Sequence, residues 1–310
     1  MEILEITKRI QELKKQKNAI ILAHYYQNPE VQAVADYIGD SYQLSKIAKA
    51  NTASVIIFCG VHFMAETAKI LSPHKKVILP VKNAGCSMAD SISYENLLKF
   101  KHENPNYIII GYVNTSAIVK TLCDVCVTSS NAIKIINHYK KMGKKIMYVP
   151  DQNLAKYVNY LNQNNPTIDF WDGECYIHHN LTVDELARQK TFHPNAKVIL
   201  HPEARLDLLQ KADFIGSTKE MLDYVKKSDA TEFIVGTEEG IRYCLEKDNP
   251  TKKFYMLSPK LVCGTMKMTK LIDVENALLE RGNRYEEIKL DQETIELAGK
   301  ALNKMLELSE

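Results

Sequence analysis

The sequence repeats itself with a period of 88 to 89 residues, and this repeat constrains the fold more than any other feature. Three apolar, strand-like runs each end in polar residues, and His24, Tyr112 and His201 mark these ends at intervals of 88 and 89 residues. Helical stretches and two further apolar runs follow in each copy. Self-similarity over such a period indicates several copies of one supersecondary unit.

Two further classes of residue keep the same spacing. A hydroxyl residue opens a helical stretch in each copy, and one cysteine lies in the loop after the third apolar run of each copy. The hydroxyl residues are Ser41, Ser129 and Thr218, and the cysteines are Cys86, Cys175 and Cys263. Because the spacing holds for three kinds of residue, we expect the three copies to share one fold.

The alternation of helical stretches with short apolar runs predicts right-handed βαβ connections and parallel sheets. We therefore expect an α/β protein built from three similar three-layer α/β/α domains with short parallel sheets. These domains should surround a pseudo-threefold axis, with the active site at their junction. The predicted boundaries are residues 1–90, 91–180 and 181–267, and the helical tail 268–310 is expected to pack on the first domain.

Composition restricts the class of protein and its partners. The chain has 310 residues, of which 45% are hydrophobic and 25% charged, as expected for a globular protein with a packed core. A net charge of +2 gives no electrostatic footprint for nucleic acid or an anionic membrane. Without a signal-peptide pattern or a membrane-spanning apolar run, the expected location is the cytoplasm. Seven cysteines, an odd number, argue against a disulfide framework.

The cysteine register points to a shared site. In parallel α/β units, ligands bind outside the carboxyl ends of the strands, so inward-facing ends would bring the three cysteine loops together. Three thiolates suit three irons of a [4Fe-4S] cluster and leave the fourth iron open to bind substrate as a Lewis acid. Alternatively, each cysteine is a small buried hydrophobe at an equivalent packing position. The spacing alone leaves both interpretations open.

The repeated hydroxyl residues also have two interpretations. A Ser or Thr at a helix N-cap satisfies free backbone N–H groups, and the same helix end attracts phosphate or carboxylate groups. Capping alone is the default for one such residue. Three of them in register favour anion binding, and the predicted substrate is small and multiply anionic.

The segment 201–203 places a histidine and a carboxylate at one strand end, where they could divide acid and base chemistry. A single strand-end histidine is more often a structural, hydrogen-bonded group. Polar residues at the equivalent ends favour a shared polar cavity, and His178 should lie close to any cluster. These equivalent residues are His24, Tyr26, Tyr112 and Asn114.

The remaining cysteines carry weaker signals. Cys123 and Cys126 have the spacing of a redox or metal pair, but no second pair accompanies them, so a structural or regulatory thiol role is favoured. Cys59 and Cys244 fall in or beside apolar segments and are interpreted as core residues. The segment 236–240 is interpreted as a tight turn into a helix, because it lacks the pattern of a phosphate-binding loop.

Taken together in their order, several segments resemble the iron-sulfur-dependent quinolinate synthase A family over nearly the whole chain. The segments are 23–27, 34–41, 84–90, 112–115, 128–132, 173–175 with His178, 201–203, 216–218, and Cys263 with Met266 and Lys267. The resemblance implies the condensation of iminoaspartate with dihydroxyacetone phosphate to quinolinate, with loss of phosphate and water, in NAD biosynthesis.

The resemblance also implies roles for individual residues. The cluster ligands would be Cys86, Cys175 and Cys263, and Cys123 and Cys126 would not be ligands. The substrate site would comprise His24, Ser41, Tyr112, Asn114, Ser129, His201, Glu203 and Thr218. Catalytic proton transfer and positioning would fall to Glu203, Tyr26, His201 and His178. Gly264 and Thr265 depart from the residues expected after the last ligand cysteine, which affects the local turn.

Two alternatives stay open at this point. One is another [4Fe-4S] hydro-lyase acting on a small dicarboxylate, and the other is a non-catalytic iron-sulfur sensor. The expected partners are the two small substrates, together with a transient contact with the enzyme that supplies iminoaspartate. Neither nucleic acid nor a membrane is an expected partner, and the sequence gives no oligomeric state.

Overall fold

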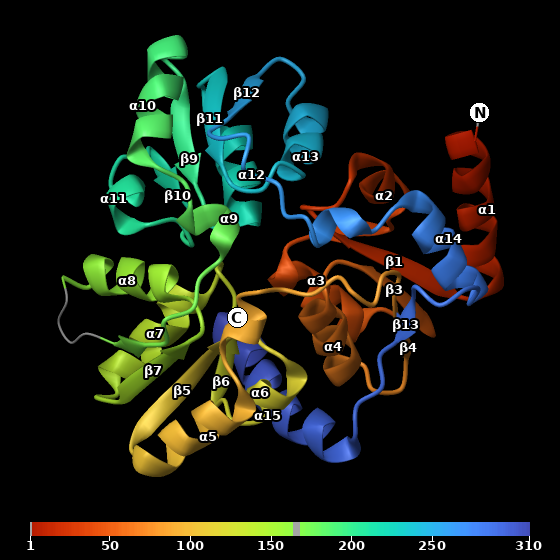
Figure 1. The fold of residues 1–310 in the computed structure, drawn as a ribbon, viewed down its shortest axis with the longest axis horizontal. Helices are drawn as coiled ribbons and strands as arrows, with labels where there is room; N and C mark the ends of the chain where they lie inside the picture. The colour runs from red at the N-terminus through yellow and green to blue at the C-terminus, as the bar shows by residue number, and fades with distance from the viewer. Residues whose placement is uncertain (1, 164–167) are drawn as a thin grey trace.

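The computed structural model describes residues 2–163 and 168–310. In it the chain forms three α/β units around a common centre, and Figure 1 shows the first in red and orange, the second in yellow and light green, and the third in green to light blue. Each unit contains one mainly parallel sheet with helices packed against it. The predicted fold class, with three similar α/β/α units and short parallel sheets, is therefore confirmed.

The three sheets share one strand order. In each unit the first strand lies between the second and the third, and the fourth strand lies outside the third. The strands are β1 (Ala19–His24), β2 (Tyr37–Gly39), β3 (Val55–Cys59) and β4 (Lys76–Leu79); β5 (Tyr107–Tyr112), β6 (Val125–Val127), β7 (Lys145–Val149) and β8 (Asp169–Phe170); and β9 (Lys197–Leu200), β10 (Phe214–Ile215), β11 (Glu232–Gly236) and β12 (Lys253–Met256). A shared order gives each unit the same polar edge at the carboxyl ends of its strands.

Helices connect these strands. The first unit contains α1 (Glu2–Gln16), α2 (Pro29–Val34), α3 (Ser41–Ala50) and α4 (His62–Leu71), followed by the 3-10 turn η1 (Ala89–Ser91). The second contains α5 (Tyr94–Glu103), α6 (Ala117–Lys120), α7 (Ala132–Lys141), α8 (Gln152–Leu161) and α9 (Tyr176–His179). The third contains α10 (Val183–Phe192), α11 (Leu206–Leu209), α12 (Thr218–Lys227) and α13 (Ile241–Asp248), and the 3-10 turn η2 (Met266–Met268) follows it.

One aspartate per unit fixes the register of the first two strands. The residue directly before the second strand of each unit is an aspartate: Asp36 before β2, Asp124 before β6 and Asp213 before β10. Each aspartate side chain accepts a hydrogen bond of 2.7 to 2.8 Å from a backbone N–H of the first strand of its unit. The backbone N–H of each aspartate donates to the same strand at 2.9 Å. The repeat therefore extends from sequence to hydrogen bonding, and it holds the strand ends of the three units in equivalent positions.

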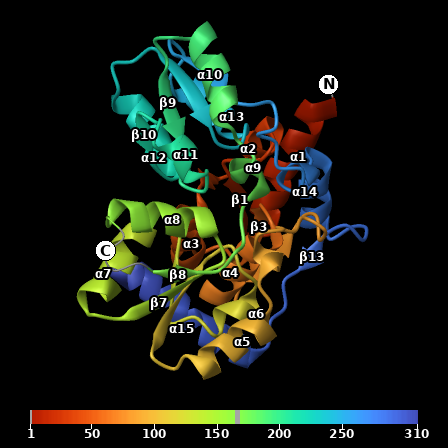
Figure 2. The same ribbon diagram turned by 60° about the vertical axis from the view of Figure 1, so that its left-hand side comes forward.

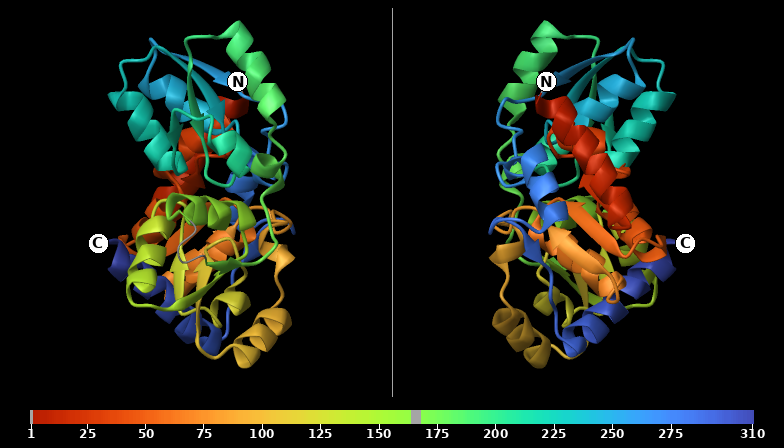
Figure 3. Two further views of the ribbon diagram at one scale, coloured as in Figure 1. Left: turned by 90° about the vertical axis from the view of Figure 1, so that its left-hand side faces the viewer. Right: turned by 90° about the vertical axis from the view of Figure 1, so that its right-hand side faces the viewer.

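The C-terminal segment belongs to two units. Helix α14 (Leu271–Leu279) packs on α1, as the right panel of Figure 3 shows, and β13 (Glu286–Glu287) pairs antiparallel with β4. Helix α15 (Gln292–Ser309), drawn in dark blue in Figure 2, contacts α4 of the first unit but also β6, α6 and α7 of the second. The segment expected on the first domain thus also covers the second.

The hydrophobic core is continuous between the first and second units. One cluster of buried side chains includes Leu22 and Ile56 of the first sheet, Ile110 and Tyr148 of the second, and Leu302 of α15. The third unit has two clusters of its own on the faces of its sheet. Among the described residues, no helix is both long and apolar enough to cross a membrane.

Candidate active site

A single chamber at the junction of the three units collects the residues singled out in the sequence. Its volume is about 150 Å³, which suits small molecules and excludes a nucleic acid or folded partner. Every predicted cluster ligand, substrate-binding residue and catalytic residue lines it: His24, Tyr26, Ser41, Cys86, Tyr112, Asn114, Ser129, Cys175, His178, His201, Glu203, Thr218 and Cys263. Residues 88 or 89 apart in sequence thus meet in space.

The three cysteines occupy equivalent local structures. The carbonyl oxygen of each accepts a hydrogen bond from the backbone N–H four residues later, at 3.0 Å for Cys86, 2.9 Å for Cys175 and 3.1 Å for Cys263. Each cysteine therefore begins a helical turn whose thiol is directed by the same backbone geometry. All three are free thiols, and each comes from a different unit. This arrangement argues against three unrelated packing positions.

The chemistry of this donor set fits an iron-sulfur cluster. Burial raises the pKa of the Cys86 thiol to about 12, and the neighbouring Cys263 raises it further. Burial also raises the pKa of the Cys175 thiol, with smaller contributions from Glu203 and Cys86. The thiols of Cys86 and Cys175 are therefore neutral until a metal displaces their protons. Three thiolates without a fourth cysteine in the described lining match three irons of a cluster.

A chain of hydrogen bonds crosses the chamber wall. The Tyr26 hydroxyl lies 2.6 Å from the Thr237 hydroxyl, which lies 2.9 Å from Nε2 of His178. Nδ1 of His178 lies 2.8 Å from one oxygen of Glu203, and Tyr112 donates to the other oxygen at 2.5 Å. Since an ionised carboxylate only accepts, Nδ1 of His178 donates to Glu203, and the Thr237 hydroxyl links Nε2 of His178 to the Tyr26 hydroxyl.

The charges in this chain are set by burial and by close neighbours. Burial alone would raise the pKa of Glu203, but His201 and His178, with the hydrogen bonds from His178 and Tyr112, lower it to about 2. Burial and the charge of Glu203 raise the pKa of Tyr26 and that of Tyr112. Glu203 is therefore ionised at neutral pH, and both tyrosines keep their protons.

His24 and His201 are equivalent in structure as well as in sequence. Nδ1 of each ring accepts a hydrogen bond from the backbone N–H two residues later, at 3.2 Å from Tyr26 and 3.4 Å from Glu203. Burial, with a smaller effect of His201 on His24, lowers the pKa of each imidazole to about 3. Each ring is thus neutral with its proton on Nε2, where it can donate to a substrate oxygen.

The repeated hydroxyl residues are not the helix caps, so the capping interpretation is wrong. Asp40 caps α3 and Ser217 caps α12, which makes Ser41 and Thr218 the first helical residues. At α7 the N-cap is Asn131, whose side chain makes no capping hydrogen bond, and Ser129 precedes it. Ser41, Ser129 and Thr218 thus line the chamber without capping a helix, and the Thr218 hydroxyl lies 3.2 Å from the Tyr26 hydroxyl.

Sequence reasoning missed Thr237 and the ion pair between Glu238 and Lys267. Thr237 and Glu238 lie in the segment 236–240, for which the sequence predicts only a turn. Glu238 is fully buried, pairs with Lys267 at 3.0 Å, and accepts a hydrogen bond of 3.1 Å from the backbone N–H of Cys263. Lys267 also donates to the carbonyl oxygen of Tyr26 at 2.8 Å. The position of Thr237 after β11, at a strand end, was the signal that could have found it.

A smaller metal site is geometrically possible in the same chamber. It would use one ligand atom from each of Cys175, His178 and Glu203, and these three atoms lie within 4.8 Å of one another. In the structure, however, His178 and Glu203 are hydrogen-bonded to each other at 2.8 Å, which occupies the ring nitrogen and carboxylate oxygen that meet there. This set therefore competes with the hydrogen-bond chain, whereas the three cysteines do not.

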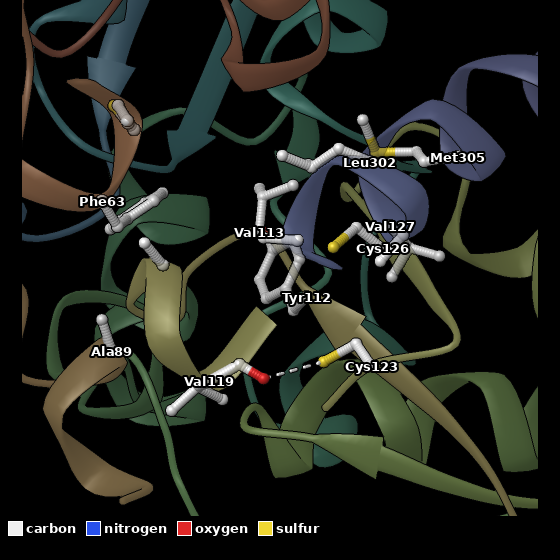
Figure 4. Close-up of a cluster of buried hydrophobic side chains, with 14 of the residues drawn as sticks. Phe63, Ala89, Tyr112, Val113, Val119, Cys123, Cys126, Val127, Leu302 and Met305 are labelled. Carbon is white, nitrogen blue, oxygen red and sulfur yellow. Dashed lines mark hydrogen bonds between the residues drawn. The ribbon is translucent and has the colours of Figure 1, made fainter. Parts of the chain in front are cut away.

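The other cysteines lie outside the chamber. Figure 4 shows Cys123 and Cys126 among buried hydrophobic side chains, with the Cys123 thiol donating to the carbonyl oxygen of Val119 at 3.6 Å. Burial raises the pKa of both thiols, that of Cys126 to about 12. Cys59 and Cys244 are also buried, as the sequence predicted for core residues.

Comparison with known proteins gives a consistent result. The model of the family described as quinolinate synthetase A protein matches residues 8–307. A quinolinate synthase of Caldicellulosiruptor saccharolyticus is 48% identical over 309 residues, covering all of both chains. Those of Alkaliphilus metalliredigens and Clostridioides difficile are 47% and 44% identical, covering 96% and 98% of this chain and 97% of each relative.

Proposed function

The chain belongs to the quinolinate synthetase A family of iron-sulfur-dependent enzymes, and we propose that its chamber condenses iminoaspartate with dihydroxyacetone phosphate to quinolinate. Phosphate and two waters leave in this reaction, so it requires repeated proton transfer to and from oxygen and carbon. The observation that carries the proposal is the meeting of one cysteine from each unit with the chain from Tyr26 to Glu203 in one small chamber.

We assign the cluster to Cys86, Cys175 and Cys263. Their convergence from three units and their equivalent helical turns support this ligand set. When bound, such a cluster supplies a Lewis-acidic iron that can hold a carboxylate or hydroxyl oxygen. Thr265, which departs from the family pattern, lies with its hydroxyl 3.4 Å from the Cys263 sulfur and so leaves the thiol in place.

Helix N-termini would hold the anionic groups of the substrates. Among the described residues that line the chamber there is no lysine or arginine. The α7 N-terminus lacks a side-chain cap, so its backbone N–H groups and the Ser129 hydroxyl suit a phosphate or carboxylate. Ser41 at the start of α3 and Thr218 at the start of α12 offer two further positions.

The hydrogen-bond chain would move the protons. Glu203 is ionised and can accept a proton through His178, whose other nitrogen is linked through Thr237 to the Tyr26 hydroxyl. A proton taken up near one end of this chain can therefore be released at the other without exchange with solvent. The neutral His24 and His201 rings would donate hydrogen bonds from Nε2 to substrate oxygen atoms, either in a leaving group or where negative charge develops.

Product analysis of anaerobically purified protein tests this function. Quinolinate should form only when both iminoaspartate and dihydroxyacetone phosphate are supplied. A hydro-lyase acting on a dicarboxylate would hydrate or dehydrate that compound without the triose phosphate, and a sensor would turn over neither. Either result would exclude the proposed reaction.

A further inference from the structure

Lys120 is a lysine with no exposed surface and no ion-pair partner among the described residues. It is the last residue of α6, and its ammonium group donates to the carbonyl oxygen of Thr115. The ammonium lies 5.6 Å from the centre of the Phe63 ring, a contact that offsets part of the cost of burying the charge. A fully buried cation with so few partners is costly unless another charge balances it.

Two other buried lysines, Lys14 and Lys75, each have partners that stabilise the charge of the ammonium group. Lys14 pairs with Asp36 at 2.6 Å. Lys75 donates to two carbonyl groups at the C-terminal end of α3, where the helix dipole favours a cation. Lys120 sits at the end of a helix of only four residues, so no comparable dipole supports it. The charge that balances Lys120 must therefore come from its surroundings.

Burial lowers the pKa of Lys120, and four acidic groups act in the opposite direction: the thiol of Cys126, the carboxylate of Glu66, and the thiols of Cys123 and Cys86. Glu66 accepts a hydrogen bond of 2.9 Å from the backbone N–H of Ala117 and lies 3.7 Å from Nδ1 of His62, and among the described residues it forms no ion pair with Lys120. Cys123 and Cys126 are buried thiols in the hydrophobic core and lie outside the chamber. Cys86 is the one acidic group of the four that lines the chamber, where binding of a metal would make it a thiolate.

Lys120 lies behind the part of the chamber wall that Phe63 forms. Phe63, whose ring the ammonium approaches, lines the chamber together with Cys86. Figure 4 shows Val119, the residue before Lys120, with Phe63 and Ala89 to its left and Cys123 to its right. Lys120 is thus shielded from solvent and from substrate, and acts on the site only through its charge.

We propose that Lys120 supplies the buried positive charge that balances an iron-sulfur cluster held in part by Cys86. This inference rests on the proposed function. A [4Fe-4S]²⁺ core with three thiolates carries one net negative charge, and reduction adds another. A nearby ammonium stabilises both states in a medium of low polarity and the reduced state more. Lys120 should therefore strengthen cluster binding and raise the reduction potential of the cluster.

The test compares the variants K120M and K75M with the wild type, each as cluster-free protein and after reconstitution with iron and sulfide. In cluster-free protein, K120M should unfold at the same temperature or a higher one than the wild type, since it removes an unbalanced buried charge. The increase in unfolding temperature on reconstitution should be smaller for K120M. K75M should lower the unfolding temperature of both forms equally, because its ammonium serves a helix end far from the cluster.

The reduction potential gives a second readout that needs no turnover. In a redox titration followed by electron paramagnetic resonance, the midpoint of K120M should be more negative than that of the wild type, and that of K75M unchanged. If K120M does not fold, K120Q is used, because its amide can still donate to Thr115 but carries no charge.

Two outcomes overturn the inference in different ways. Equal cluster-dependent stabilisation and equal midpoints in wild type and K120M would remove Lys120 from this role while leaving the cluster in place. A wild type that binds no [4Fe-4S] cluster would instead remove the proposed function on which the inference rests.

Discussion

Tyr112 of the second unit donates a 2.5 Å hydrogen bond to Glu203 of the third, and this contact joins two units across the chamber. The variant Y112F removes the donor but keeps the ring. We expect kcat to fall by about tenfold or more, because a hydrogen bond to a buried charge contributes about 1.5–3 kcal/mol. Steady-state kinetics and urea unfolding of the same preparation would check this. Full activity in a folded Y112F would show that Glu203 does not need Tyr112.

Thr237 is the central link between Tyr26 and His178. Replacing it by valine conserves shape and removes the hydroxyl, so the chain should no longer pass a proton, and kcat should fall by about 10²-fold. The matched control T237S keeps the hydroxyl and should retain most of the activity. Equal kcat values for T237V and T237S would mean that the hydroxyl takes no part in proton transfer.

Gly240 allows the first and third units to approach each other closely. A Cβ atom there would lie 2.7 Å from the backbone of Tyr26, so G240A should displace Tyr26 from Thr237 and lower the activity more than the stability. Gly264, directly after Cys263, has no atom within 4 Å of the equivalent position. The control G264A should therefore keep both the cluster content and the activity. Activity measured beside thermal unfolding separates the two effects, and a fully active G240A would contradict the argument.

Acid should destabilise the protein through His24 and His201. Burial lowers the pKa of each from 6.5 to about 3, so between these pH values the unfolded chain binds protons that the folded chain does not. The free energy of unfolding therefore rises with pH in this window and is lost on acidification. The variant H24N removes one of these groups and should flatten the slope. Urea unfolding of cluster-free protein from pH 4 to 7 tests this, and parallel curves for H24N and wild type would contradict it.

The repeat allowed the sequence to predict the arrangement of the chamber. Parallel strands of equal order end at one edge, so residues at equal spacing, such as Cys86, Cys175 and Cys263, converge when the units meet around one centre. Helical periodicity also predicts the final helix, but an apolar stripe does not specify which surface it covers. The contacts of α15 with both α4 and β6 therefore emerged only from the structure.

Local patterns were less informative about single side chains. A hydroxyl at a helix start can be the N-cap or the first helical residue, a difference of one position that the sequence of Ser41 and Thr218 does not resolve. Thr237 was overlooked because its partners, Tyr26 and His178, are 211 and 59 residues away in the chain. Such contacts depend on how the units pack, and no local motif encodes them.

The central claim is that one cysteine from each unit holds a single cluster that the reaction needs. The most direct measurement is the iron and sulfide content of anaerobically purified wild type and of C86S, C175S, C263S and C126S, with a quinolinate assay on each. Wild type and C126S should each contain about four irons and four sulfides per chain. Each of the three ligand variants should lose the cluster and the activity together. A full cluster in any of those three, or its loss in C126S alone, would contradict the claim.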